Sequence, residues 1–258
     1  MNCFGAFLRI AFKNYFAYRA TLFTSVLGIL LWVAIQIAVW AYVFQKDAQM
    51  LAYMTAYVIL AGVLNDFYNN RVTDLVAEKI SSGNFAIDLI KPVNPLFSFW
   101  GTAFGGTAAA LFCRSLPMVI VYSPCLMHLH WSIGKILLSM IAAILGLVLV
   151  NLIFTLIGYL AFVFIEIWPY RRLVDDTIRL LSGAVIPIAF FPDWLIFAAK
   201  LTPFYFLYTF PINLLTKDLP VSEITGNYIV MLIWIAGLSL LLRLVYYRAV
   251  KYCIIQGG

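Results

Sequence analysis

The sequence predicts an all-α integral membrane protein, organised as a single transmembrane domain over residues 1–258. The chain is 64% hydrophobic and only 11% charged, whereas soluble domains carry about 25% charged residues. Charge-poor runs recur along it, most of them close to the roughly 20 residues with which a helix crosses the hydrocarbon core of a bilayer. Aromatic residues, which concentrate at membrane interfaces, make up 17% of the sequence. A chain of this composition has lipid as its solvent.

Six charge-poor runs predict six membrane-spanning helices. Their expected limits are approximately residues 20–45, 48–66, 99–122, 136–165, 177–192 and 224–243. The fourth run extends roughly 45 Å at about 1.5 Å per residue. Because a hydrocarbon core is only about 30 Å thick, this helix must tilt or protrude from the membrane.

The fifth run is the least regular. It follows a charged loop at residues 168–176, contains Gly183 and Pro187, and is short for a complete crossing. A second short apolar piece occupies residues 193–200. We interpret the two as a broken helix followed by a re-entrant segment, because non-helical backbone at membrane depth needs cover from protein or a wet cavity. Residues 201–223, rich in proline and aromatic residues, are interpreted as a shallow interfacial cap.

Two further segments have the pattern of amphipathic helices. Residues 4–18 place apolar and aromatic residues at helical spacing with basic residues between them, which is typical of a helix lying in the cytoplasmic interface. Residues 72–80 repeat the pattern after the second span. Polar residues at 81–84 end that helix, and the two prolines in residues 91–95 predict a rigid turn.

The basic residues are distributed unevenly between the two sides that six crossings define. Twelve of the 17 fall on the side of the termini and four on the other, with Arg114 inside a span. Cytoplasmic loops of membrane proteins carry such an excess, so we expect both termini to be cytoplasmic. The basic residues are dispersed among hydrophobic runs and form no patch, so the net charge of +6 does not indicate a nucleic-acid partner.

The sequence lacks the common motifs of catalysis. No P-loop, H-E-x-x-H or G-x-S-x-G pattern occurs, so we expect no ATPase or hydrolase site in this chain. His128 and His130 have no acidic or cysteine partner at metal-binding spacing, and an exposed loop is the simpler interpretation. We expect no bound metal and no cofactor of its own.

Ionisable residues within spans are functional candidates because burying them in lipid is costly. Arg114 is the strongest, and two interpretations stay open: pairing or snorkelling, and a place in a pathway or subunit interface. Gln36 and Asn151 lie at mid-depth, where hydrogen bonding between helices is the simpler interpretation and a pathway the alternative. Gly101 and Gly105 offer a small face to another helix.

Carboxylates are missing from the middle of the predicted spans. Asp66, Glu166 and Asp193 all lie at span ends. A proton-coupled carrier normally has carboxylates within its helices. The energy for any transport is therefore expected to come from outside this chain.

The layout and two local motifs resemble the bacterial ABC exporter permeases of the type V fold, and most closely the drug- or lipid-export permeases of about 260 residues. The motifs are Glu78-x-Ile80-x-x-Gly83 leading to Leu89-Ile90-Lys91-Pro92-Val93-Asn94-Pro95, and Ile186-Pro187-x-x-Phe190-Phe191-Pro192-x-Trp194 followed by Thr202-Pro203-Phe204. The six spans, the N-terminal amphipathic helix and the broken fifth span extend the resemblance over almost the whole chain.

The resemblance implies a permease subunit in the bacterial plasma membrane that exports an amphipathic or hydrophobic substrate, such as a drug, a peptide or a lipid-like molecule. ATP and Mg²⁺ would bind to a separate ABC ATPase, present in two copies, and a second six-span permease, related or identical, would pair with this one. The alternative is a non-transport scaffold or a lipid-modifying membrane protein, which would need clustered His, Asp or Glu at one membrane face. The substrate stays unidentified.

The resemblance also assigns residues to two regions. The cytoplasmic element that couples to the ATPase would contain Arg71, Asp74, Glu78, Lys79, Lys91 and Pro92. An ordinary interfacial helix that touches only lipid headgroups is the alternative. The extracellular gate would contain Pro187, Phe190, Phe191, Pro192 and Trp194. The alternative there is a proline-kinked span.

Overall fold

The computed structural model describes residues 3–16, 19–69, 72–91, 94–127 and 131–256. Over these residues the protein consists of helices joined by short turns, and no strand occurs among them. Their all-helical character agrees with the fold class expected from the sequence.

Five stretches of the described chain are long and apolar enough to cross a membrane. They are Ala20–Val43, Ala48–Ser81, Pro95–Leu126, Ile133–Phe162 and Val221–Arg248. The helices within them are α2 (Arg19–Val43), α3 (Ala48–Tyr68) with α4 (Val72–Ser81), α6 (Pro95–Ala110) with the π-helical turn η1 (Leu111–Ser115) and α7 (Leu116–Leu126), α8 (Ile133–Tyr159) with the 3₁₀ turn η2 (Leu160–Phe162), and α12 (Val221–Gln256).

The sixth expected span, residues 177–192, is not among these five. Helix α9 (Trp168–Leu181) begins in the expected loop and ends before Gly183. Its charged residues form i,i+4 ion pairs that suit a helix but lower its hydropathy. Gly183 has a φ of +82°, which ends helical geometry. The 3₁₀ turn η3 (Ile188–Phe190) and helix α10 (Asp193–Leu201) follow.

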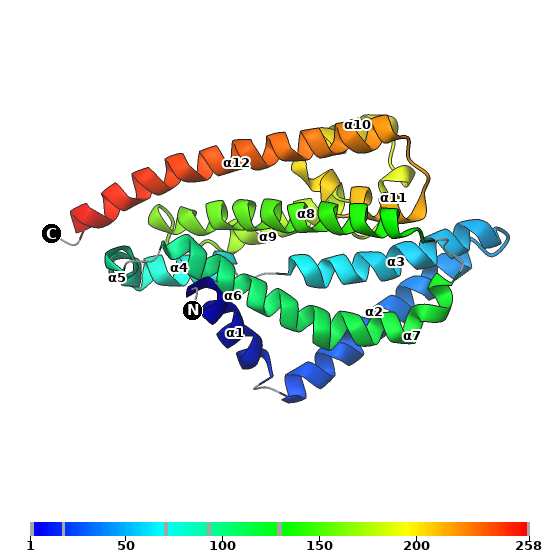
Figure 1. Ribbon diagram of the computed structural model, residues 1–258, viewed down its shortest axis with the longest axis horizontal. Helices are drawn as coiled ribbons and strands as arrows, with labels where there is room; N and C mark the ends of the chain where they lie inside the picture. The colour runs from blue at the N-terminus through cyan, green and yellow to red at the C-terminus, as the bar shows by residue number, and fades with distance from the viewer. Residues whose placement is uncertain (1–2, 17–18, 70–71, 92–93, 128–130, 257–258) are drawn as a thin grey trace.

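Helices α8 and α12 run side by side in the same direction (Figure 1). Near their first turns, the Tyr228 hydroxyl donates a hydrogen bond to the Leu138 carbonyl at 2.5 Å. Near their other ends, the rings of Tyr159 and Tyr246 lie 6.3 Å apart. Residues 163–220, which connect the two helices, must therefore return from one end of the bundle to the other.

Most of residues 203–214, the middle of the region expected as a shallow cap, belong to the main core. This part of the chain forms the 3₁₀ turn η4 (Pro203–Phe206) and helix α11 (Thr209–Thr216). Phe206, Phe210 and Ile212 are at most 1% exposed and pack with residues of α3, α8 and α12. Pro203 begins the buried turn η4, and Pro211 lies in α11, where its carbonyl accepts a hydrogen bond from the Ser139 hydroxyl at 2.9 Å.

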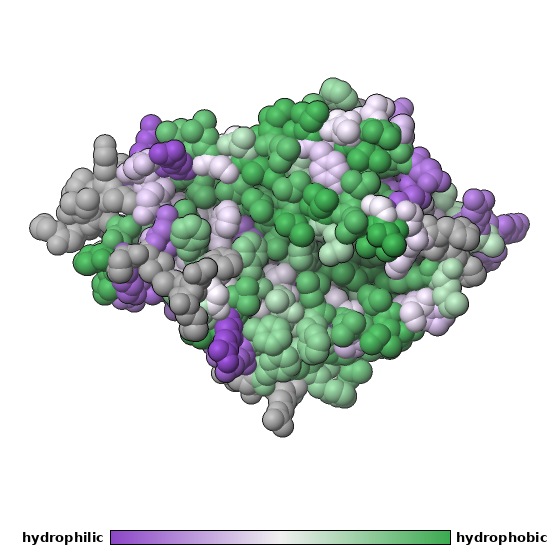
Figure 2. Space-filling view, in the orientation of Figure 1, coloured by the Kyte–Doolittle hydropathy of each residue, from purple (hydrophilic) through white to green (hydrophobic). Residues whose placement is uncertain are grey.

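The two ends of the bundle differ in what they carry. Both termini and the short helices α4 and α5 (Asn84–Ile90) lie at one end, whereas the α2–α3 turn and α10 lie at the other (Figure 1). Figure 2 shows the surface of the protein in the orientation of Figure 1. Hydrophobic residues lie across the middle of the visible surface, and hydrophilic residues gather toward its two ends. Exposed apolar side chains on α2, such as Leu31 and Ile35 at 62% each, fit a surface that faces lipid.

Helix α1 (Cys3–Tyr15) packs against α6 at a glycine. A Cβ built on Gly105 would meet the Leu8 carbonyl oxygen and would lie 2.7 Å from the Ala11 Cβ. The small face expected on α6 is thus occupied by a helix of the same chain. A Cβ on the neighbouring Gly106 would meet nothing within 4 Å.

This pair of glycines gives a matched test of α1 docking. We expect Gly105→Ala to destabilise the protein by about 1–3 kcal/mol, because overpacking forces two backbones apart. Gly106→Ala should be neutral or slightly stabilising, since alanine favours helix. Thermal unfolding in detergent and proteolysis of the N-terminal segment measure both effects. Equal losses in the two variants would show that α1 does not need this close approach.

Candidate functional site

A buried ion pair joins α3 to η1. Asp66 is fully buried, and its Oδ1 lies 3.1 Å from Arg114 Nη2 without accepting an aligned hydrogen bond from it. The neighbouring Ser115 hydroxyl donates to Asp66 Oδ2 at 2.9 Å. The π-helical turn adds a residue to the helix and directs Arg114 and Ser115 together toward α3. Arg114 is therefore paired inside the bundle.

The same arginine borders a cavity of about 450 Å³, here called the central cavity. It lies between α2, α3, η1, α9 and the chain that follows α9. Its lining consists of Ser25, Gly28, Ile29, Trp32, Ala61, Asn65, Arg114, Arg179, Ala184, Val185 and Tyr208. Of the two interpretations left open for Arg114, the structure shows a paired side chain that also faces a cavity.

A second cavity of about 210 Å³, the proximal cavity, lies toward the end of the bundle that carries α4. It shares Asn65, Arg179 and Tyr208 with the central cavity. Its other polar residues include Arg171 and Asp175 of α9. Arg171 also forms an ion pair with Asp74 of α4. The two cavities are therefore neighbours beside α9 and have three polar lining residues in common.

A third cavity of about 200 Å³, the distal cavity, lies toward the opposite end, and Tyr57, Pro187 and Thr209 are among its lining residues. Hydrogen bonds connect Tyr57 and Thr209 of its lining to Gly183 and Ser182, which directly precede Ala184 of the central cavity. The Tyr57 hydroxyl donates to the Gly183 carbonyl at 2.8 Å, and the Thr209 hydroxyl donates to the Ser182 carbonyl at 2.7 Å. A Cβ on Gly183 would lie 2.8 Å from the Tyr57 hydroxyl, so the contact requires glycine.

The residues expected at the gate do not gather at one point. Pro187 is buried beside the distal cavity. The Phe190 ring stacks on Trp40 of α2 at 5.8 Å, and Phe191 packs against the main core. Pro192 is exposed, and so is Trp194, at 70%.

The two polar mid-depth candidates line none of these three cavities. Gln36 is half-buried in α2. Asn151 is fully buried in α8, where its amide donates to Leu147 of the same helix at 2.7 Å. The bond between helices forms one turn later, where Trp100 Nε1 donates to the Thr155 hydroxyl at 3.1 Å.

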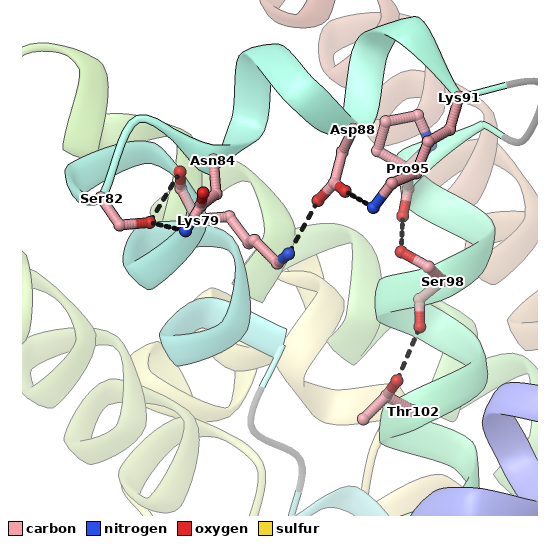
Figure 3. A network of polar contacts seen from close by, with 8 residues as sticks. All are labelled: Lys79, Ser82, Asn84, Asp88, Lys91, Pro95, Ser98 and Thr102. Atoms are coloured by element: carbon pink, nitrogen blue, oxygen red, sulfur yellow. Dashed lines mark hydrogen bonds and ion pairs between the residues drawn. The ribbon is translucent and has the colours of Figure 1, made fainter.

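The expected coupling residues lie on and around α4 and α5. Lys79 and Lys91 approach Asp88 from two sides, at 3.1 and 2.6 Å (Figure 3). Glu78 is exposed. Arg71 and Pro92, like the His128 and His130 loop, lie outside the described residues. Lys79 on α4 and Lys91 after α5 thus hold the two short helices together through one carboxylate.

The Asp88 carboxyl is nearly buried, at 7% exposed. Burial raises its pKa, but the hydrogen bonds and charges of Lys91 and Lys79 outweigh this, so the pKa lies below the ordinary 3.8. Because the folded-state pKa is lowered, the two ion pairs stabilise the fold at pH values above 3.8. That stabilisation is lost only as the pH falls through the lower folded-state value.

Several residues of the site were not recognised from the sequence. Asp66 was placed at a span end, and no local pattern shows that Arg114, far along the chain, reaches it. Tyr57 lies inside the second predicted span, and no local pattern distinguishes it from the other apolar and aromatic residues there. One signal was available: the i,i+4 spacing of Arg171 with Asp175 indicates the helix α9.

Among the described residues, no group of three or more His, Cys, Asp or Glu side chains could hold a metal ion.

Five helical stretches able to span a membrane, with cavities between them, define a polytopic helical membrane protein. A comparison with known families is specific: the profile of the ABC-2 family transporter proteins matches residues 30–257, and the chain belongs to this family. A search of curated proteins found no match. Membership implies the membrane-spanning permease of an ABC transporter, which associates with an ABC ATPase. The resemblance seen in the sequence motifs is thereby confirmed.

The Asp66–Arg114 pair yields a test of the buried charges. Asp66→Asn should destabilise the protein by about 3 kcal/mol, because it leaves a guanidinium in the bundle without its countercharge. The double variant Asp66→Asn with Arg114→Gln should recover part of the loss. Thermal unfolding in detergent measures both, with Asp218→Asn as the control, since Asp218 pairs with Lys135 at an exposed site. Additive effects of the two substitutions would exclude a coupled pair.

Proposed function

We propose that this chain is the permease subunit of an ABC exporter, in which the substrate passes from the proximal to the central and then to the distal cavity. The observation that carries the proposal is that α3 contributes to the lining of all three cavities, with Tyr57 at the distal, Ala61 at the central and Tyr68 at the proximal cavity. The Tyr57–Gly183–Thr209 contact would close the path between the central and distal cavities. The substrate would be amphipathic or hydrophobic. The present conformation would be closed toward the distal end.

The topology of the proposal has six crossings, five by continuous helices and one by residues 163–220. The parallel course of α8 and α12 supports the sixth crossing. The end with α1, α4, α5 and the C-terminus would face the cytoplasm of a bacterium, because basic residues concentrate there. Helix α1 would border the cytoplasmic interface while packed on α6.

The proposed complex contains two permeases, identical or related, and two ATPase subunits that bind ATP and Mg²⁺. This chain would bind no cofactor. Helices α4 and α5 would contact the ATPase, with Asp74, Glu78, Lys79 and Lys91 at or near the contact. The residues Pro187–Trp194 would cover the outer end of the pathway.

The contacts of α4 suggest how a movement would reach the cavities. The Asp74–Arg171 ion pair connects α4 to α9, the helix that carries Arg179 into both the proximal and central cavities. The Thr73 hydroxyl donates to the Phe154 carbonyl of α8 at 2.8 Å. A displacement of α4 would therefore move two of the elements that line the pathway.

Co-purification tests the complex, and charge reversal tests the connection. A separately encoded ABC ATPase should co-purify with the permease. In that complex we expect Asp74→Arg to lower substrate-dependent ATP hydrolysis several-fold, because Asp74 and Arg171 would then repel. The swap Asp74→Arg with Arg171→Asp should restore much of it.

Arg172→Asp is the matched control, because the ion pair of Arg172 within the described residues is with Asp176, on the exposed face of α9. Its effect on coupling should be small. Transport by the isolated chain on an ion gradient alone would contradict the proposed function. An Asp74→Arg complex with unchanged coupling would contradict the connection through α4.

The closed contact between the central and distal cavities can be opened selectively. Tyr57→Phe removes the hydroxyl that donates to Gly183. A hydrogen bond contributes about 1 kcal/mol, so we expect the open population to rise by roughly five-fold. Faster leakage of a small dye from vesicles containing the permease would measure it. Tyr53→Phe, at another wall of the distal cavity, is the control, and equal leakage from both variants would exclude the contact as the barrier.

A further inference from the structure

The polar side chains of the central cavity are mainly hydrogen-bond donors. Two guanidinium groups, from Arg114 and Arg179, border it together with the Asn65 amide and the Tyr208 hydroxyl. No Asp or Glu is among the described residues that line it. A cavity with this lining favours a ligand that accepts hydrogen bonds and carries negative charge.

The countercharge of Arg114 lies outside the cavity. Asp66 is fully buried behind the arginine and does not line the cavity. The Arg114 Nε has no hydrogen-bond partner within the described chain. Asp66 therefore balances the charge of Arg114, but the Nε–H group of the arginine remains without an acceptor among the described residues.

Of the two arginines at the cavity, Arg179 has no ion pair among the described residues, although the more distant charge of Asp175 acts on it. Asp175, one turn earlier on α9, lies 3.6 Å from Arg171, which also pairs with Asp74. Over the described ranges of the sequence, no carboxylate lies within ion-pair distance of Arg179. An unpaired arginine beside lipid-facing helices is costly unless water or a ligand solvates it.

The remaining wall of the cavity is apolar. Ile29 and Trp32 of α2 and Val185 after α9 contribute it, and Gly28 leaves room beside them. Trp32 is 37% exposed and Arg179 is exposed, so the cavity opens to one side. The charged wall and the apolar wall face one space.

We propose that the central cavity binds an amphiphile with an anionic head group, a carboxylate, sulfonate or phosphate, which Arg179 and Arg114 contact while its apolar part lies against α2. Reading this ligand as the substrate rests on the proposed function. The binding itself needs no ATPase.

The test uses the full-length permease in phosphatidylcholine nanodiscs and two fluorescent probes. One is a dansylated undecanoic acid, and the other is the uncharged amide of the same chain. The acid should bind at least ten-fold more tightly than the amide. Arg179→Gln should weaken binding of the acid about ten-fold and leave the amide unchanged. Arg179→Lys should lie between, because it keeps the charge but loses the bidentate geometry.

Arg172→Gln is the matched control, since Arg172 lies on the same helix, is exposed, and lines none of the three cavities. Thermal unfolding of each variant verifies the fold. Equal affinity of acid and amide in the unaltered protein, or an unchanged affinity of Arg179→Gln for the acid, would overturn the inference. Failure of the ATPase to co-purify would overturn the proposed function and leave this result intact.

Two further measurements identify the source of the anion. Phosphatidylglycerol is substituted for part of the phosphatidylcholine in the nanodiscs. Displacement of the acid probe would support the anionic site with a membrane lipid as its occupant. Undiminished binding would support the same site with a ligand other than bulk anionic lipid. Inorganic phosphate, which lacks the apolar part, should compete weakly in either case.

Discussion

Buried backbone groups must find partners inside the protein, and the packing around one irregular segment follows from how it meets that demand. Between α9 and α10 the chain leaves helical geometry. Tyr57 donates to the Gly183 carbonyl, and Thr209 donates to the Ser182 carbonyl through both its hydroxyl and its backbone N–H. Helix α3 and the buried turn before α11 are therefore fixed around the break.

Charge imposes the second constraint. The Asp66–Arg114 pair allows a cation to border the central cavity at a reduced electrostatic cost, since its countercharge is already in place. Arg171 contacts α4 through Asp74 and the next turn of α9 through Asp175. Helix α9 thus joins α4 to the lining of the proximal and central cavities. An amphipathic helix suits this position better than a fully apolar span, because one face meets the core and the other carries the ions.

Much of the architecture was predictable from the sequence. Five of the expected spans are apolar and long enough to cross a membrane, which hydropathy alone indicates. The small face predicted at Gly105 does receive a helix, α1. The errors lie in residues 163–220. The segment Trp168–Asp176 looked like a loop because its charges obscured the helical spacing. Residues 203–214 looked superficial because prolines and aromatics are common at interfaces, yet most of them are core. Of the site, Arg114 was recognised, whereas Tyr57, Asp66 and Arg179 were not.

The sequence by itself determined the class of protein, the spanning helices and the amphipathic segments, because hydropathy and helical period are local properties of the chain. The motifs within residues 78–95 and 186–204 also indicated the family by their resemblance to ABC permeases. Only the tertiary structure decided that α8 and α12 are parallel, that Asp66 meets Arg114, and that Arg179 faces a cavity without an ion pair. Each of these depends on contacts between residues far apart in sequence, whose proximity is set by packing of the whole bundle.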